Sequence, residues 1–90
     1  MKMARIYRLV DPETGEIRYI GQTSKTLQER LRKHLSYRDR RHTTRWIEAL
    51  ARKGLSPEIE EIVCVPDEQA DGVERLLISF YRSVGCRLTN

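Results

Sequence analysis

The most reactive combination of side chains in this sequence consists of two tyrosines, an arginine, a histidine and a glutamate. Tyr7 and Tyr19 lie in two neighbouring segments that alternate apolar and polar residues, Arg30 and His34 are four residues apart, and Glu74 lies within a long apolar pattern. An arginine holds phosphoryl oxygens in a planar fork, a carboxylate binds a divalent cation, and a tyrosine or histidine accepts a proton from water. The set is compatible with a phosphodiesterase site, and with many other arrangements.

A hairpin is expected to position the two tyrosines. Residues 11–15 (D-P-E-T-G) have the composition of a turn, with apolar and β-branched segments on both sides. With Leu9 opposite Ile17, Tyr7 lies opposite Tyr19 on the same face of the sheet. This register depends on the type of turn, because a slip of one residue would separate the tyrosines.

The first helix is expected to position the arginine and the histidine. A capping box predicts a helix over residues 26–35. With Leu27 at zero on a helical wheel, His34 falls near −20°, Arg30 near −60° and Arg32 near 140°. His34 therefore lies on the apolar stripe, Arg30 at its edge and Arg32 in solvent. A hydrogen-bonded core histidine and an arginine with a buried stem would give the same pattern.

A third helix, predicted from Asp67 to about Val84, places a carboxylate among apolar residues. With Val73 at zero, an apolar arc extends from about −60° to about 140°, and Glu74 falls near 100°. The other members of this arc are Ala70, Leu76, Leu77, Ile78, Phe80, Tyr81 and Val84. A buried carboxylate must be paired, hydrogen-bonded or bound to metal. An ion pair with an arginine such as Arg30 and a metal site both remain open.

The order of the elements predicts an α+β fold. Strands are expected at residues 4–10, 16–21 and 58–65, and a loop at 37–42. A second helix is expected to start at a Thr43 or Thr44 cap, to bury Trp46, Ile47 and Leu50, and to end before Gly54. The order is β-β-α-α-β-α, which predicts a small sheet flanked by helices in a single domain over residues 1–90.

The charge of the chain is unevenly distributed. Lys and Arg number 17 against 13 Asp and Glu, and the excess of cations lies in the first two thirds of the chain. This asymmetry indicates an anionic partner, with nucleic acid as the first candidate and an ordinary solvated surface as the alternative. No apolar run approaches the length of a membrane helix, and the N-terminus lacks a signal peptide, so we expect no membrane partner and a cytoplasmic location. Cys64 and Cys86 are expected to be two buried or idle thiols rather than part of a zinc site or a disulfide scaffold.

Two short motifs connect these features. Ile6-Tyr7 and Tyr19-Ile20-Gly21 resemble the paired signature of the GIY-YIG nuclease family. Further positions that match this family in order are Arg30, His34, Glu74 and Asn90. The chain departs from the family where Arg5 replaces the first glycine, which puts the local strand geometry in doubt. The end of the sequence at Asn90 is compatible with a free-standing nuclease or with the catalytic domain of a longer protein.

The resemblance implies a three-stranded antiparallel sheet with helices packed around it, and cleavage of DNA phosphodiesters that depends on a divalent metal. Tyr7 would be the general base or would orient the attacking water, with Tyr19 as its neighbour. Arg30 would bind the scissile phosphate, and His34 would assist proton transfer or hold Tyr7. Whether Tyr7 or His34 is the base stays open.

The resemblance also implies that Glu74 is the sole protein ligand to Mg²⁺ or Mn²⁺, with no small-molecule cofactor. Gly21 and Asn90 would support the site structurally, Asn90 by tying the tail to the core.

The basic segment after the first helix is the expected DNA-contacting surface. It contains Arg38, Arg40 and Arg41, next to Tyr37, and Arg45 follows in the second helix. Contacts from these residues would go to phosphates, so binding would depend on salt. An ordinary solvated loop is the alternative. A monomer or weak dimer is expected, and a non-catalytic nucleic-acid-binding or adaptor domain is the competing hypothesis for the whole chain.

Overall fold

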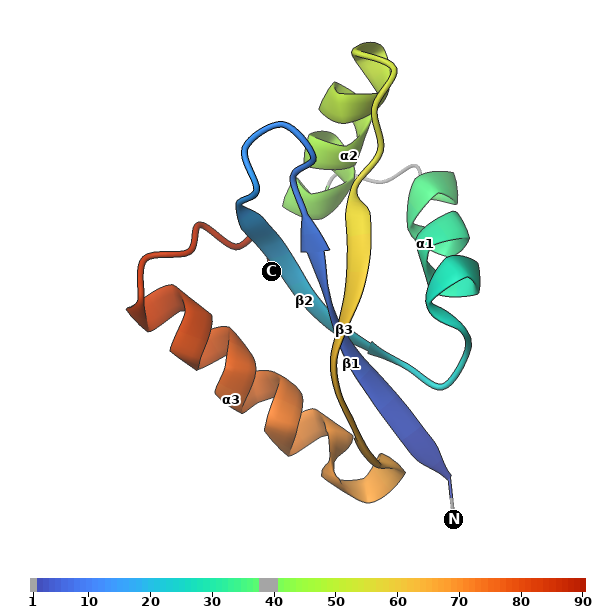
Figure 1. Cartoon of the computed structure of the whole chain (residues 1–90), viewed down its shortest axis with the longest axis vertical. Helices are drawn as coiled ribbons and strands as arrows, with labels where there is room; N and C mark the ends of the chain where they lie inside the picture. The colour runs from blue at the N-terminus through green and yellow to red at the C-terminus, as the bar shows by residue number, and fades with distance from the viewer. Residues whose placement is uncertain (1, 38–40) are drawn as a thin grey trace.

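A three-stranded antiparallel sheet with helices on both faces forms the framework of the chain (Figure 1). The computed structural model describes residues 2–37 and 41–90. The elements are β1 (Met3–Val10), β2 (Ile17–Thr23), α1 (Leu27–Ser36), α2 (His42–Arg52), β3 (Glu58–Pro66), a 3₁₀ turn (Asp67–Gln69) and α3 (Ala70–Ser83). The strand order is β2-β1-β3, so β1 is central. The α+β class and the order β-β-α-α-β-α are confirmed.

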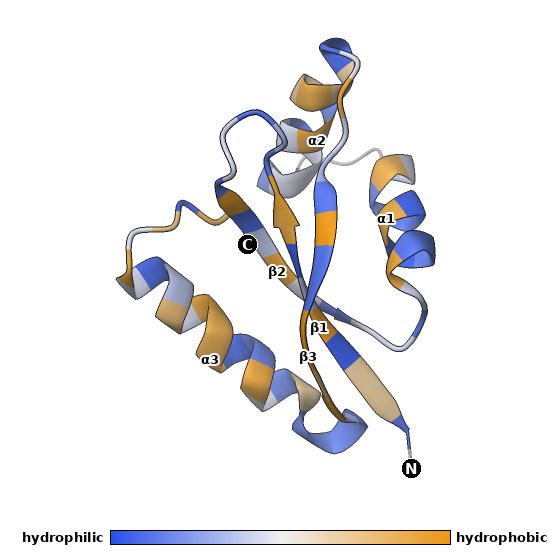
Figure 2. Cartoon of the chain, viewed as in Figure 1, coloured by the Kyte–Doolittle hydropathy of each residue, from blue (hydrophilic) through white to orange (hydrophobic). Residues whose placement is uncertain are grey.

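Alternation along β1 divides the core between the two faces of the sheet. Tyr7 and Leu9 are fully buried in a cluster completed by α1 and α2, whereas Ala4 and Ile6 are buried in a cluster completed by α3. Figure 1 shows α1 and α2 on one side of the sheet and α3 on the other. Figure 2 shows that hydrophilic and hydrophobic residues alternate in the first part of β3, whereas its second part is hydrophobic. The period of two therefore assigns Tyr7 to the α1/α2 face.

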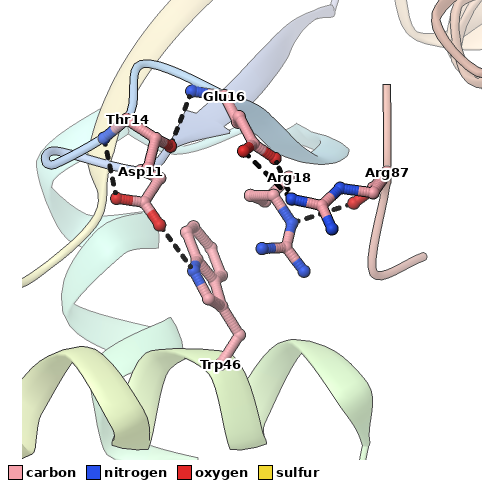
Figure 3. A network of polar contacts seen from close by, with 6 residues as sticks. All are labelled: Asp11, Thr14, Glu16, Arg18, Trp46 and Arg87. Atoms are coloured by element: carbon pink, nitrogen blue, oxygen red, sulfur yellow. Dashed lines mark hydrogen bonds and ion pairs between the residues drawn. The ribbon is translucent and has the colours of Figure 1, made fainter. Parts of the chain in front are cut away.

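The β1–β2 turn is fixed by a short polar network (Figure 3). The Asp11 carboxylate accepts hydrogen bonds from the backbone N–H groups of Glu13 and Thr14 at 2.8 and 3.3 Å, and from the Trp46 indole at 3.4 Å. Gly15 closes the turn at φ 76°, in the left-handed region that glycine adopts without strain. The predicted turn thus forms, and it is joined to α2.

The predicted register of this hairpin is wrong by two residues. Leu9 lies opposite Tyr19 rather than Ile17, and Tyr7 lies opposite Gly21. A bulge causes the shift, because Val10 pairs with Ile17 and Arg18 is left between the two ladder positions. Ile17 consequently packs with the α3 cluster. A shift of two residues leaves every side chain on the same face of the sheet, so Tyr7 and Tyr19 still share one face.

Helix α1 begins as predicted. The Thr26 hydroxyl accepts from the Glu29 backbone N–H and donates to the Glu29 carboxylate, both at 3.1 Å.

Helix α2 begins differently from the prediction. Its N-cap is Arg41, without a side-chain capping bond, and the expected loop therefore ends before His42. Thr43 and Thr44 lie buried in the first turn instead. The Thr43 hydroxyl bonds to Thr89, so the C-terminal segment takes up the polar group that was expected to cap the helix.

Helix α3 buries a narrower stripe than its sequence suggests. Asp67 begins the 3₁₀ turn, and α3 itself starts at Ala70. Leu76, Phe80 and Val84 are 70%, 55% and 60% exposed, so the predicted buried arc is wrong at these positions. The stripe that packs on the sheet lies on the other half of the arc, which is the half that contains Glu74.

Two further expectations concern the described residues. Cys64 and Cys86 are free cysteines, but Cys64 is exposed and Cys86 is partly exposed, so neither is buried. Within residues 2–37 and 41–90, no helix has the length and apolar character needed to cross a membrane.

Candidate active site

A chain of hydrogen bonds joins three of the predicted residues on the α1/α2 face. The Arg30 Nε–H donates to the Tyr7 hydroxyl oxygen at 3.0 Å, and this hydroxyl lies 2.7 Å from His34 Nε2. An arginine can only donate, so the Tyr7 oxygen accepts from Arg30 and its own proton points to His34. His34 Nε2 is then the acceptor. The four-residue spacing on α1 brings both partners to one phenol.

Burial sets the protonation states of the Tyr7 phenol and the His34 imidazole in this series of hydrogen bonds. Burial raises the pKa of Tyr7 well above its usual value near 10, and the bond from Arg30, which acts in the opposite direction, does not offset it. Burial, followed by the positive charges of Arg30 and Arg41, lowers the pKa of His34 from 6.5 to about 4. At neutral pH the phenol is therefore protonated and the imidazole is neutral, which is the state that the hydrogen bonds require.

Tyr19 packs beside the hydrogen-bonded Tyr7 and His34. Its ring centroid lies 6.2 Å from that of Tyr7 and 5.1 Å from that of His34. Burial raises the pKa of Tyr19 as well. The two tyrosines are diagonal neighbours across the hairpin, which is the arrangement left after the shift in register.

Gly21 makes the approach of the two rings possible. It lies opposite Tyr7 in the ladder, and a Cβ atom at this position would be 2.5 Å from the Tyr7 hydroxyl and 2.7 Å from Tyr19 Cε2. No side chain fits there without moving a ring. The glycine that ends the second short motif is thus a packing requirement of the site.

The family comparison agrees with this arrangement. The family model of the GIY-YIG catalytic domain matches residues 3–86, which is nearly the whole chain. The chain belongs to the GIY-YIG family. Neither the comparison with curated proteins nor that with solved structures finds a match.

Arg5, which replaces a glycine of the GIY-YIG signature, lies within the continuous strand β1, although the register with β3 shifts just after it, between Ile6 and Tyr7. It pairs in register with Thr23 on one side and Cys64 on the other. Its guanidinium binds Glu61 at 3.1 Å and the Lys25 carbonyl at 3.2 Å. The side chain is partly exposed and is held by these two contacts.

Glu74 lies on α3, across the edge strand β2 from the tyrosines. Its carboxylate accepts from the Gln22 amide at 2.9 Å, and the same amide donates to Asp71 at 2.7 Å. Its negative charge contributes to raising the pKa values of Tyr7 and Tyr19, which places it within electrostatic reach of the site. Glu74 and Arg30, both described, form no ion pair, so the ion pair considered from the sequence is absent.

The donor set around Glu74 fits a magnesium-type ion. Among the described residues, no group of three or more His, Cys, Asp or Glu side chains surrounds a common point. A single half-buried carboxylate still suits Mg²⁺, which binds through one or two carboxylates and keeps waters and substrate phosphate as its remaining ligands.

Asn90 ties the C-terminal segment to the site. Its side chain accepts from the Ile20 backbone N–H at 2.9 Å and donates to the Ile20 carbonyl at 2.7 Å. Ile20 lies between Tyr19 and Gly21, so Asn90 holds the part of β2 on which the site depends.

The basic residues predicted to contact DNA are only partly described. Arg41 is exposed, with its guanidinium 4.9 Å from the Tyr37 ring centroid, and Arg45 is exposed on α2. Arg38 and Arg40 lie outside the described residues. Arg45 therefore belongs to the exposed surface of α2.

A cationic depression beside Arg30 was not predicted. It has a volume of about 410 Å³, and its cations are Lys25, Arg30 and Lys33. Lys33 lies three residues after Arg30, and this i, i+3 spacing is the signal that would have placed both on one side of α1. Gln22 also lines it, and its place on the Glu74 side follows from alternation with Ile20.

Proposed function

We propose that this GIY-YIG domain is an endonuclease that hydrolyses DNA phosphodiester bonds with the help of Mg²⁺ or Mn²⁺. The observation that carries the proposal is the directed chain from Arg30 through Tyr7 to a neutral His34, with the Glu74 carboxylate within electrostatic reach. A series of hydrogen bonds that runs from Arg30 through Tyr7 to His34 is suited to taking a proton from water at the Tyr7 oxygen and passing a proton on to His34.

The proton path follows from the hydrogen bonds. Water attacks phosphorus and its proton passes to the Tyr7 oxygen, while the Tyr7 proton passes to His34 Nε2. The phenol thus never has to exist as a free phenolate, which its raised pKa would make costly. A new P–O bond forms to the water oxygen, and the bond to the leaving oxygen breaks.

Arg30 serves both the phenol and the phosphate. Its Nε–H is committed to Tyr7, and its Nη1 lies 3.4 Å from the Tyr37 hydroxyl. Arg30 also lines the depression that contains Lys25 and Lys33. We therefore place the scissile phosphate there, where a planar guanidinium stabilises the charge that develops on its oxygens.

Glu74 would hold the metal ion. When bound, a divalent cation polarises a phosphoryl oxygen and stabilises the leaving oxygen. The Gln22 amide keeps the carboxylate oriented toward β2. A monomer with one such site would nick one strand at a time.

Cleavage of supercoiled plasmid tests the proposal. Wild-type protein with Mg²⁺ or Mn²⁺ is expected to convert plasmid to nicked circles, with no conversion in EDTA. Glu74→Ala is expected to abolish nicking and to leave DNA binding intact or slightly stronger, because one negative charge is removed. Binding without nicking by the wild type in either metal would instead support the adaptor hypothesis.

A further inference from the structure

A cleft of about 380 Å³ is lined by His34, whose Nε2 atom also bonds to the Tyr7 hydroxyl. We call it the side cleft. Strand β2, helix α1, the start of α2 and the C-terminal segment enclose it. Its lining includes Tyr19, His34, Tyr37, Arg41, Thr43 and Asn90. Nothing in the proposed hydrolysis uses this space.

Aromatic rings and a guanidinium dominate the side cleft. The ring centroid of His34 lies 5.1 Å from that of Tyr19 and 5.8 Å from that of Tyr37. Arg41 lies over the Tyr37 ring at 4.9 Å. Rings and arginine planes of this kind are the surfaces on which unpaired nucleobases stack. The volume lies within the range of about 300–1,000 Å³ that is typical of small-ligand pockets.

The polar groups of the side cleft are largely used within the protein. The Asn90 amide bonds to both backbone groups of Ile20, and the Thr43 hydroxyl bonds to Thr89. These groups are poorly placed to read the edge of a base. A base held here would be recognised by its flat face, with little preference for its identity.

The side cleft adjoins the place where we put the phosphate. His34 lines it and also bonds to Tyr7, and Tyr37 lines it and also accepts a bond from Arg30. In paired duplex DNA the bases are stacked inside the helix, away from a protein group that contacts phosphate. A base reaches a cleft beside that phosphate only when it is unpaired or has left the stack.

We infer that the side cleft binds an unpaired nucleobase next to the scissile phosphate, which makes DNA with an unpaired nucleotide at a branch, flap, bulge or end the preferred substrate class. This inference rests on the proposed nuclease function. The binding energy comes from stacking on the Tyr37–Arg41 pair, with the phosphate contacts of Lys25, Arg30 and Lys33 common to every DNA.

Three otherwise identical DNA duplexes test the inference by equilibrium binding in EDTA. At one position they carry a paired thymine, a bulged thymine or a bulged abasic residue. We expect the bulged thymine to bind about tenfold more tightly than the paired one, as for one stacked base, and the abasic bulge to lose most of this gain. Equal binding of the thymine and abasic bulges would overturn the inference, because only flexibility would then be recognised.

Matched variants assign the effect to the side cleft. Tyr37→Leu is expected to remove the preference for the bulged thymine, whereas Tyr37→Phe, which keeps the ring and loses the bond from Arg30, is expected to retain it. Phe80→Leu removes an exposed ring from α3, on the other face of the sheet, and is expected to leave the preference unchanged. An equal loss in Tyr37→Leu and Phe80→Leu would contradict the assignment. If Tyr37→Leu does not fold, the comparison of thymine and abasic bulges by the wild type still decides.

Cleavage of the same three DNAs with Mn²⁺ separates this inference from the nuclease proposal. Cleavage of all three at equal rates, with equal binding, would refute the side cleft and leave the nuclease. A binding preference without cleavage of any DNA would refute the nuclease and leave the side cleft as a nucleobase site.

Discussion

At the scale of single residues, the Tyr7 oxygen has a fixed direction of proton donation. Arg30 donates to it, and it donates to a histidine whose pKa is lowered to about 4. We expect kcat/KM to rise with pH as His34 loses its proton near pH 4, and to be level at neutral pH. Tyr7→Phe is expected to remove nearly all activity with little change in DNA binding, because only the hydroxyl is lost. A pH–rate profile of each protein measures both effects.

His34→Gln is the control for this proton path. A glutamine can accept the hydrogen bond but cannot take up a proton at neutral pH, so activity is expected to fall by about 10²–10⁴-fold. If His34→Gln instead stays active and the rate keeps rising above pH 8, the phenolate of Tyr7 is the base, and the relay through His34 is wrong.

Two glycines give opposite predictions for the same substitution. Gly21→Ala would place a methyl group 2.5 Å from the Tyr7 hydroxyl, so we expect a loss of about 1–3 kcal/mol in the free energy of unfolding and a large loss of cleavage. Gly72→Ala on α3 meets no atom within 4 Å and is expected to raise stability by about 0.5–1 kcal/mol. Urea unfolding of both variants checks the pair, and a stable, active Gly21→Ala protein would show that the rings can move apart.

At the scale of elements, the phase of α1 decides which arginine reaches the Tyr7 hydroxyl. Arg30 bonds to Tyr7, whereas Arg32 is exposed two residues further on. Arg30→Ala is expected to reduce the cleavage rate by about a hundredfold or more, as for other lost electrostatic stabilisers. Arg32→Ala is expected to affect binding only, through a smaller dependence on salt. Cleavage rates at saturating DNA check this, and equal losses in the two variants would mean that the helix phase is wrong.

The sequence predicts the elements well because each has a local signal. The Asp11–Gly15 turn and the Thr26 capping box formed as expected, and His34 is buried as the wheel predicts. These features depend on residues within one or two turns of each other. The same locality explains why Arg30 and His34 meet Tyr7 once the sheet is in place.

The features that the sequence does not predict depend on long-range packing. The bulge that leaves Arg18 between two ladder positions shifts the hairpin register. The residues of the turn do not indicate that a bulge will form. The apolar arc of α3 is broader than the stripe that the sheet can cover, so Phe80 was wrongly placed in the core. Thr43 does not cap α2, and its hydroxyl bonds instead to Thr89, which is far away in sequence.

At the scale of the whole molecule, the C-terminal segment covers the outer edge of β2. Thr89 donates its backbone N–H to the Arg18 carbonyl at 2.6 Å, and Asn90 bonds to both backbone groups of Ile20. These bonds satisfy polar groups that an edge strand otherwise leaves to solvent or to another chain. The segment therefore links the last residues of the sequence to the strand that carries Tyr19 and Gly21.

Two substitutions in this segment distinguish a structural link from surface charge. Asn90→Ala leaves the backbone groups of buried Ile20 without their partner, so we expect a loss of about 1–3 kcal/mol in the free energy of unfolding. Cleavage is expected to fall with it, because the neighbouring Tyr19 and Gly21 lose their support. Arg87→Ala removes only an ion pair with Glu16, whose arginine side chain is 76% exposed, and is expected to cost less than about 1 kcal/mol and to leave cleavage unchanged. Urea unfolding and plasmid nicking measure both variants. Equal stability of the two would show that the edge of β2 does not need the segment, and the support of the site would then lie in the hairpin and α1 alone.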